Sequence, residues 1–110
     1  LTVAMLVVGP VLALGAFFAG SFSREQYDML RKEVDWEGNN PPGVLLHAAS
    51  FDDAGGAHVV DIWESPEKMN AFVTTRLMPA FQKLGFAPPN VEVFPAHNIN
   101  AYPAIDKSKP

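Results

Sequence analysis

Residues 44–69, VLLHAASFDDAGGAHVVDIWESPEKM, decide the fold of this chain. Val44–Phe51 is apolar and free of turn residues, which is typical of a strand, and Asp52–Gly56 is typical of a hairpin connection. Ala57–Glu64 is then expected to return as the neighbouring antiparallel strand. Ser65-Pro66 follows as a helix N-cap with proline in the first helical position. The stretch predicts a strand, a hairpin, a second strand and the start of a helix.

Two amphipathic helices are expected around this hairpin. Ser23 and Gln26 have the spacing of a capping box, and a helix of about 12 residues should follow. The second helix is expected from Ser65 to Leu84, because apolar residues recur there at helical spacing. Pro79 lies inside it, which predicts a kink or a short break near Leu77-Met78.

The remaining chain supplies a last strand and a tail. Pro88-Pro89 is expected to turn the chain, and Val91–Phe94 is expected to form a short strand before Pro95. We expect residues 1–98 to form a single domain and residues 99–110 to form a C-terminal tail. Residues 1–10 are expected to be an N-terminal extension of that domain, with no assigned role.

The first 20 residues carry no charge and allow two interpretations. An apolar run of this length could cross a bilayer or act as an export signal. Gly9-Pro10 instead divides it into two extended pieces, Val3–Val8 and Val11–Phe18. A strand at residues 11–19 would complete a βαββαβ order, so we favour an α+β ferredoxin-like domain with an antiparallel sheet. A cytoplasmic protein is expected, with an exported or membrane-anchored protein as the alternative.

Composition excludes several classes of function. The 110 residues carry a formal charge of −4, which argues against a nucleic-acid partner. The absence of cysteine removes disulfides, thiolate catalysis and cysteine-ligated metals. The three histidines show no metal-binding spacing, and no phosphate-binding glycine loop occurs. No metal and no cofactor are therefore expected.

Polar residues within the apolar strands are the candidate site residues. His47 and Asp61 lie on strands that should pair, and they could act as a base and the carboxylate that orients it. Val60 and Ile62 suit the face that the helices cover. The opposite face, with Asp61 and Trp63, should then be open and should bind a small hydrophobic or aromatic molecule. The residues expected to line that cavity are Leu45, Phe51, Val59 and Trp63.

Residues 61–72, DIWESPEKMNAF, resemble the strand-to-helix junction of the antibiotic biosynthesis monooxygenase-like proteins, within the dimeric α+β barrel superfamily. Residues 41–49, 77–81 and 88–98 are similar to small uncharacterised bacterial members of that family. The resemblance covers residues 11–98. It implies a ferredoxin-like protomer whose open sheet face pairs with that of a second copy.

The family includes cofactor-free monooxygenases of polycyclic aromatic substrates, haem-degrading monooxygenases, isomerases and dehydratases. Trp63 matches a strand tryptophan of the haem-degrading branch. That branch also uses an asparagine in its first strand and a histidine in its second helix. Residues 11–19 hold no asparagine and residues 65–84 hold no histidine, so the resemblance does not extend to haem degradation.

These observations together predict a homodimer that binds a small molecule and oxygenates it without a cofactor. His47 is the expected base, Asp61 its orienting carboxylate and Trp63 an aromatic wall. The alternative is a non-catalytic ligand-binding or stress-related dimer in which the same residues only pack.

Overall fold

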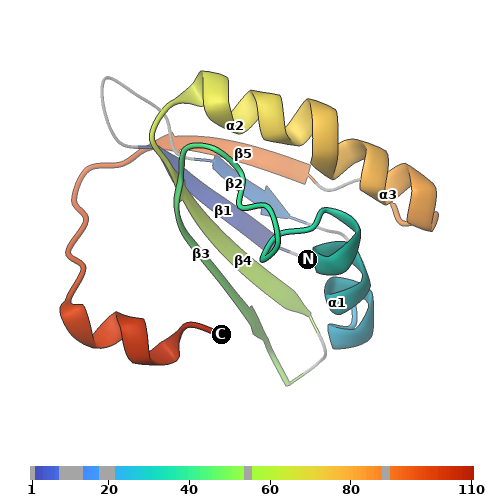
Figure 1. Ribbon diagram of the computed structural model, residues 1–110, viewed down its shortest axis with the longest axis horizontal. Coiled ribbons are helices and arrows are strands. Elements are labelled where there is room, and N and C mark those ends of the chain that lie inside the picture. The colour runs from blue at the N-terminus through green and yellow to red at the C-terminus, as the bar shows by residue number, and fades with distance from the viewer. Residues whose placement is uncertain (1, 8–13, 18–21, 54–55, 88–89) are drawn as a thin grey trace.

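The computed structural model describes residues 2–7, 14–17, 22–53, 56–87 and 90–110, and the chain has an α+β fold. Five strands form one sheet, and the α-helices lie along one side of it (Figure 1). The elements in chain order are β1 (Thr2–Val7), β2 (Leu14–Phe17), α1 (Arg24–Glu33), β3 (Val44–Phe51), β4 (Ala57–Trp63), α2 (Pro66–Phe72), η1 (Val73–Leu77), α3 (Met78–Leu84), β5 (Asn90–Pro95) and η2 (Pro103–Ser108).

The sheet is mixed rather than antiparallel throughout. Its strand order is β2-β5-β1-β4-β3, with a further pairing between β2 and β1. The hairpin strands β3 and β4 are antiparallel, as predicted, and so are β2 and β5. The strand β1 runs parallel to both β4 and β5. The prediction of an antiparallel sheet is wrong at β1, because the supposed N-terminal extension is itself a strand inside the sheet.

Local signals set the ends of the helices. The Ser23 side chain accepts from the Gln26 backbone and the Gln26 side chain accepts from the Ser23 backbone, which confirms the capping box. The Ser65 side chain caps α2 by accepting a hydrogen bond from the Lys68 backbone N–H, without a reciprocal bond. The short break predicted near Leu77-Met78 does not occur, because a π-helical turn, η1, joins α2 to α3 without a gap. That turn widens the helix just before a residue that has no backbone N–H to donate.

The face of the hairpin that the helices cover is the reverse of the one expected. Val59, Asp61 and Trp63 are buried, and Val59 and Trp63 belong to the core that α1, α2 and α3 complete. On the other face Val60 is 36% exposed, whereas Ile62 is buried, at 8% exposure, although it is not part of the core that the helices complete. Strand alternation settles which residues share a face, whereas the placement of the helices settles which face is buried.

A β-bulge in β3 changes the pattern at its start. Val44 pairs with Trp63 and Leu46 pairs with Ile62, so Leu45 is an extra residue between the two pairs. Leu45 is 52% exposed, so it does not line an enclosed cavity beside His47.

The described parts of the apolar N-terminal segment, residues 2–7 and 14–17, are both strands. The ends of the two expected pieces, at residues 8, 11–13 and 18, lie outside the described residues. Within the described ranges, no helix combines the length and the apolar character that crossing a membrane requires.

Candidate functional site

Three side chains from three elements form one chain of hydrogen bonds beneath α1. The Nδ1 atom of His47 lies 2.5 Å from Oδ1 of Asp61. Its Nε2 atom lies 2.6 Å from the hydroxyl oxygen of Tyr27. Asp61 is 2% exposed, whereas the His47 side chain keeps 18% of its surface exposed. The chain therefore runs from a buried carboxylate to a group that solvent can reach.

Backbone geometry holds the two strand residues together. His47 and Asp61 are direct partners in the register of β3 and β4, so their side chains leave the sheet on the same face. Tyr27 comes from α1, which begins at its Ser23 cap and lies over that face. The planes of the Tyr27 and His47 rings differ by only 5°. The two rings are thus joined edge to edge through the phenol oxygen.

Burial controls the proton affinities at the two ends of this chain. Burial raises the pKa of the Asp61 carboxyl, and the hydrogen bond and charge of His47 oppose that rise. Burial also raises the pKa of the Tyr27 phenol to about 12, although the nearby Arg31 guanidinium lowers it. The phenol therefore keeps its proton at neutral pH.

The donors and acceptors fit one direction of proton transfer. An ionised Asp61 only accepts, so His47 donates its Nδ1–H to that carboxylate. The Nε2 atom is then the acceptor, and the Tyr27 hydroxyl donates to it. This arrangement orients the histidine as a base. When the Tyr27 oxygen accepts a proton, the hydroxyl proton of Tyr27 can pass to the Nε2 atom of His47.

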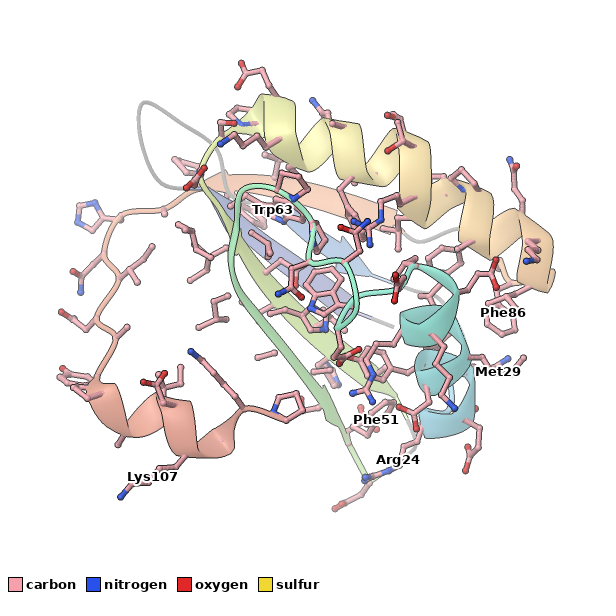
Figure 2. The ribbon with its side chains drawn as sticks, viewed as in Figure 1. Arg24, Met29, Phe51, Trp63, Phe86 and Lys107 are labelled. Carbon is pink, nitrogen blue, oxygen red and sulfur yellow. The ribbon has the colours of Figure 1, made fainter. Side chains whose placement is uncertain are left out.

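Aromatic rings surround the His47 imidazole. The Trp36 indole, from the loop after α1, lies 4.3 Å from the His47 ring between centroids. Phe51 meets the Tyr27 ring edge-on at 5.9 Å, and the Arg24 guanidinium lies 5.0 Å from the Phe51 centroid. Figure 2 shows Phe51 and Arg24 together at the end of β3 near α1. These rings lower the polarity around the base.

The other predicted site residues divide into separate groups. Trp63 has no exposed surface and packs against Phe72 at 5.5 Å between ring centroids, so it does not form the wall of an open face (Figure 2). Val59 is likewise a core residue. Leu45 is exposed at the bulge. Phe51 alone of the four lies beside the Tyr27–His47 pair.

Sequence reasoning missed two members of the site, Tyr27 and Trp36. Tyr27 lies on α1 and Trp36 in the loop after it, and both pack against the core. A tyrosine on the buried stripe needs a partner for its hydroxyl, and that requirement was the available signal.

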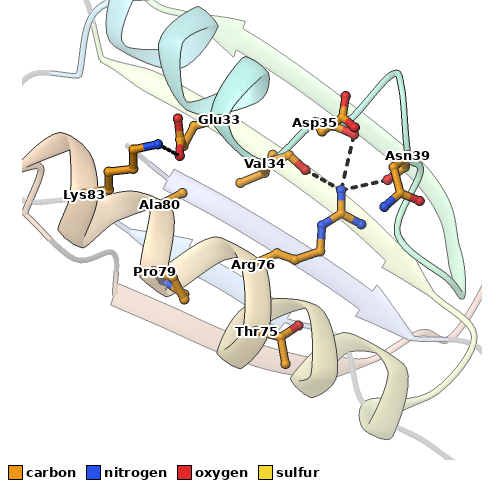
Figure 3. A pocket seen from close by; sticks show the side chains of 9 residues that line it. All are labelled: Glu33, Val34, Asp35, Asn39, Thr75, Arg76, Pro79, Ala80 and Lys83. Atoms are coloured by element: carbon orange, nitrogen blue, oxygen red, sulfur yellow. Dashed lines mark hydrogen bonds and ion pairs between the residues drawn. The ribbon is translucent and has the colours of Figure 1, made fainter.

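A cleft of about 420 Å³ lies elsewhere, between the end of α1 and the η1–α3 helix (Figure 3). It contains none of the residues of the hydrogen-bonded chain. Arg76 reaches across it, and its Nη2 atom donates to the backbone oxygens of Val34, Asp35 and Asn39. A cation at the carboxyl end of α1 satisfies carbonyls that the helix leaves free. The cleft is therefore best explained as a helix-capping contact.

Within the described residues, no three histidine, aspartate or glutamate side chains gather as a metal site would require. Comparisons with family profiles, with curated proteins and with solved structures find no match to this chain.

Proposed function

We propose that this protein binds a small aromatic molecule beside Tyr27 and His47 and removes a proton from it. The observation that carries the proposal is the 2.5 Å contact between His47 and a carboxylate that is 2% exposed. A buried Asp61 orients the imidazole and stabilises the positive charge that it acquires as a base. The surrounding Trp36 and Phe51 rings suit an aromatic ligand.

The proposed reaction is oxygenation without a cofactor. The substrate loses a C–H proton to the Tyr27 oxygen while the Tyr27 proton passes to His47. The resulting carbanion reacts with O₂ to give a peroxide anion, which takes a proton back from His47 through Tyr27 and becomes a hydroperoxide. The hydroperoxide loses water and leaves a ketone. A CH₂ group and O₂ thus become C=O and H₂O, so the atoms and electrons balance. The protein supplies the base and a site of low polarity.

The resemblance of residues 61–72 to the monooxygenase-like family supports this reaction class. From β2 onward the elements follow the order βαββαβ, which supports a ferredoxin-like arrangement in sequence, although β1 and not β2 lies between β5 and β4 in the sheet. We also propose that the sheet face opposite the helices pairs with a second copy. Val60 and Phe94 support this part, because they are 36% and 48% exposed.

Oxygen uptake with anthrone as the probe tests the proposal. Anthrone is a polycyclic ketone whose carbanion reacts directly with O₂. We expect the protein to accelerate uptake above the rate in buffer. The His47→Gln variant should lose about 100-fold or more of that acceleration, as removal of a general base does. A His58→Gln variant is the control, because His58 pairs with exposed Asp52 at the edge of the hairpin. No acceleration, or equal rates in the two variants, would overturn the proposal.

A further inference from the structure

Arg76 binds three backbone oxygens of the segment that follows α1. Its Nη2 atom donates to the oxygens of Val34, of Asp35 at 3.2 Å and of Asn39 at 2.7 Å (Figure 3). These oxygens lie on both sides of Trp36, in a turn that the Asn39 N–H closes by donating to the Asp35 oxygen. One guanidinium group therefore fixes both ends of the turn that carries the indole.

A series of ring contacts leads from Arg76 to the candidate site. The Arg76 guanidinium lies 5.4 Å from the centroid of the Phe72 ring. Phe72 meets the Trp36 indole edge-on at 5.4 Å, and the indole lies 4.3 Å from the His47 ring, both measured between centroids. Phe72 is 4% exposed, so it cannot turn without repacking the core. The indole is thus held by a core ring and by a turn that Arg76 fixes.

The indole covers a part of the imidazole that the hydrogen-bonded chain leaves open. Asp61 and Tyr27 occupy the two ring nitrogens of His47, and such bonds lie in the plane of the ring. A centroid separation of 4.3 Å is too short for two rings side by side, so Trp36 lies over a face of the imidazole. The position of the indole therefore determines how a ligand approaches His47.

We infer that Arg76 is a positioning residue of the candidate site, which acts by holding Trp36 over the His47 imidazole. The inference rests on the proposed function, since it treats His47 as the base, and it adds a residue that lies outside the site. Arg76 belongs to the π-helical turn η1, and such turns within α-helices often occur at functional sites. The bonds that cap α1 thus also place an aromatic wall of the site.

Proton NMR of the histidine rings tests the positioning without any substrate. The ring current of Trp36 shifts the carbon-bound protons of His47, and a Trp36→Leu variant shows where these signals lie without the indole. We expect Arg76→Met to move the His47 signals in the same direction as Trp36→Leu does, because the freed turn carries the indole away. Arg76→Lys should return them only part of the way, since an ammonium lacks the guanidinium geometry.

Two controls separate this effect from a general loss of structure. Lys83→Met should leave the His47 signals in place, because Lys83 lies on the same helical segment but pairs with Glu33. The His58 signals should stay in place in every variant, since His58 pairs with an exposed aspartate at the edge of the hairpin. His47 signals that Arg76→Met or Trp36→Leu leaves in place would overturn the inference.

Acrylamide quenching of fluorescence gives a second measurement, with the milder Arg76→Lys variant. The chain has two tryptophans, and Trp63 has no exposed surface, so quenching by acrylamide mainly reports on Trp36. We expect quenching to increase severalfold in Arg76→Lys and to stay unchanged in Lys83→Met. Equal quenching in the two variants would contradict the positioning role.

Oxygen uptake with anthrone distinguishes this inference from the proposed function. Arg76→Met should raise KM severalfold with a smaller fall in kcat, because a misplaced wall weakens the binding of substrate and transition state alike. No acceleration by the unsubstituted chain would overturn the proposed function, whatever the NMR result. Acceleration with the same KM in Arg76→Met and Lys83→Met would overturn the inference alone.

Discussion

His47 and Asp61 face each other across two antiparallel strands, with Nδ1 and Oδ1 2.5 Å apart. The pair lies between the sheet and α1, and the hydroxyl of Tyr27, on α1, is hydrogen-bonded to the Nε2 atom of His47. Because the carboxylate is buried, most of its stabilisation must come from His47. That dependence leads to the first prediction.

Replacing His47 should destabilise the fold far more than replacing His58. His47→Ala leaves Asp61 buried without its partner, and we expect a loss of about 3 kcal/mol in the free energy of unfolding. His58→Ala removes an ion pair whose side chains are 48% and 45% exposed, so it should cost less than about 1 kcal/mol. Urea unfolding at one protein concentration measures both. Similar losses in the two variants would contradict the buried position of the pair.

Alkaline pH should destabilise the protein partly through Tyr27. The folded phenol has a pKa of about 12, raised from 10.0 by burial. The unfolded chain therefore releases this proton first, and the contribution of Tyr27 to stability is present below pH 10 and is lost between pH 10 and about 12. Melting temperatures across that range should fall more steeply for the unsubstituted chain than for Tyr27→Phe. Parallel curves would show that the phenol is not buried.

Arg76 should stabilise the end of α1. Arg76→Met removes donation to the backbone oxygens of Val34, Asp35 and Asn39, and we expect a loss of about 2 kcal/mol. Arg76→Lys should recover only part of it, since one ammonium cannot reproduce the guanidinium geometry. Lys83→Met is the control, because Lys83 is 70% exposed in its pair with Glu33. Chemical denaturation measures the free energy of unfolding of the three variants. An Arg76→Met variant that is no less stable than Lys83→Met would refute the capping role.

Asp35→Gly should make the protein more stable. Asp35 has a φ of 53° directly after α1, where it takes the left-handed conformation that favours glycine. The backbone oxygen that accepts from Arg76 remains in the variant. We expect a gain of about 0.5–1 kcal/mol, whereas Gly85→Ala at φ 72° should lose about 1 kcal/mol. Thermal unfolding measures both changes, and a loss in Asp35→Gly would contradict this account of the helix end.

Sequence predicted what neighbouring residues determine. The Ser23–Gln26 capping box, the hairpin around residues 52–56 and the irregular helix before Pro79 all follow from local backbone chemistry. The pairing of His47 with Asp61 followed from the same hairpin register. These features depend on few residues, so one sequence is enough to find them.

Sequence did not predict what long-range packing determines. Alternation put Asp61 and Trp63 on one face but could not say that the helices cover that face. The extra residue Leu45 broke the alternation without a turn signal. Tyr27 meets His47 only because α1 packs on the sheet, and β1 takes its place through pairing with β4 and β5. The sequence therefore identified His47 and Asp61 but not Tyr27 and Trp36, and it placed the site on the sheet face that the helices do not cover.

The central claim is that Asp61 holds His47 with its Nε2 atom ready to accept a proton. Nitrogen-15 NMR of the His47 ring, in protein labelled at histidine, tests it at neutral pH without any substrate. The account predicts a hydrogen on Nδ1, which is hydrogen-bonded to Asp61, and no hydrogen on Nε2. The Nε2 signal should shift in the Tyr27→Phe variant, because that variant lacks the hydroxyl that donates to Nε2. A ring with hydrogen on Nε2 would contradict it.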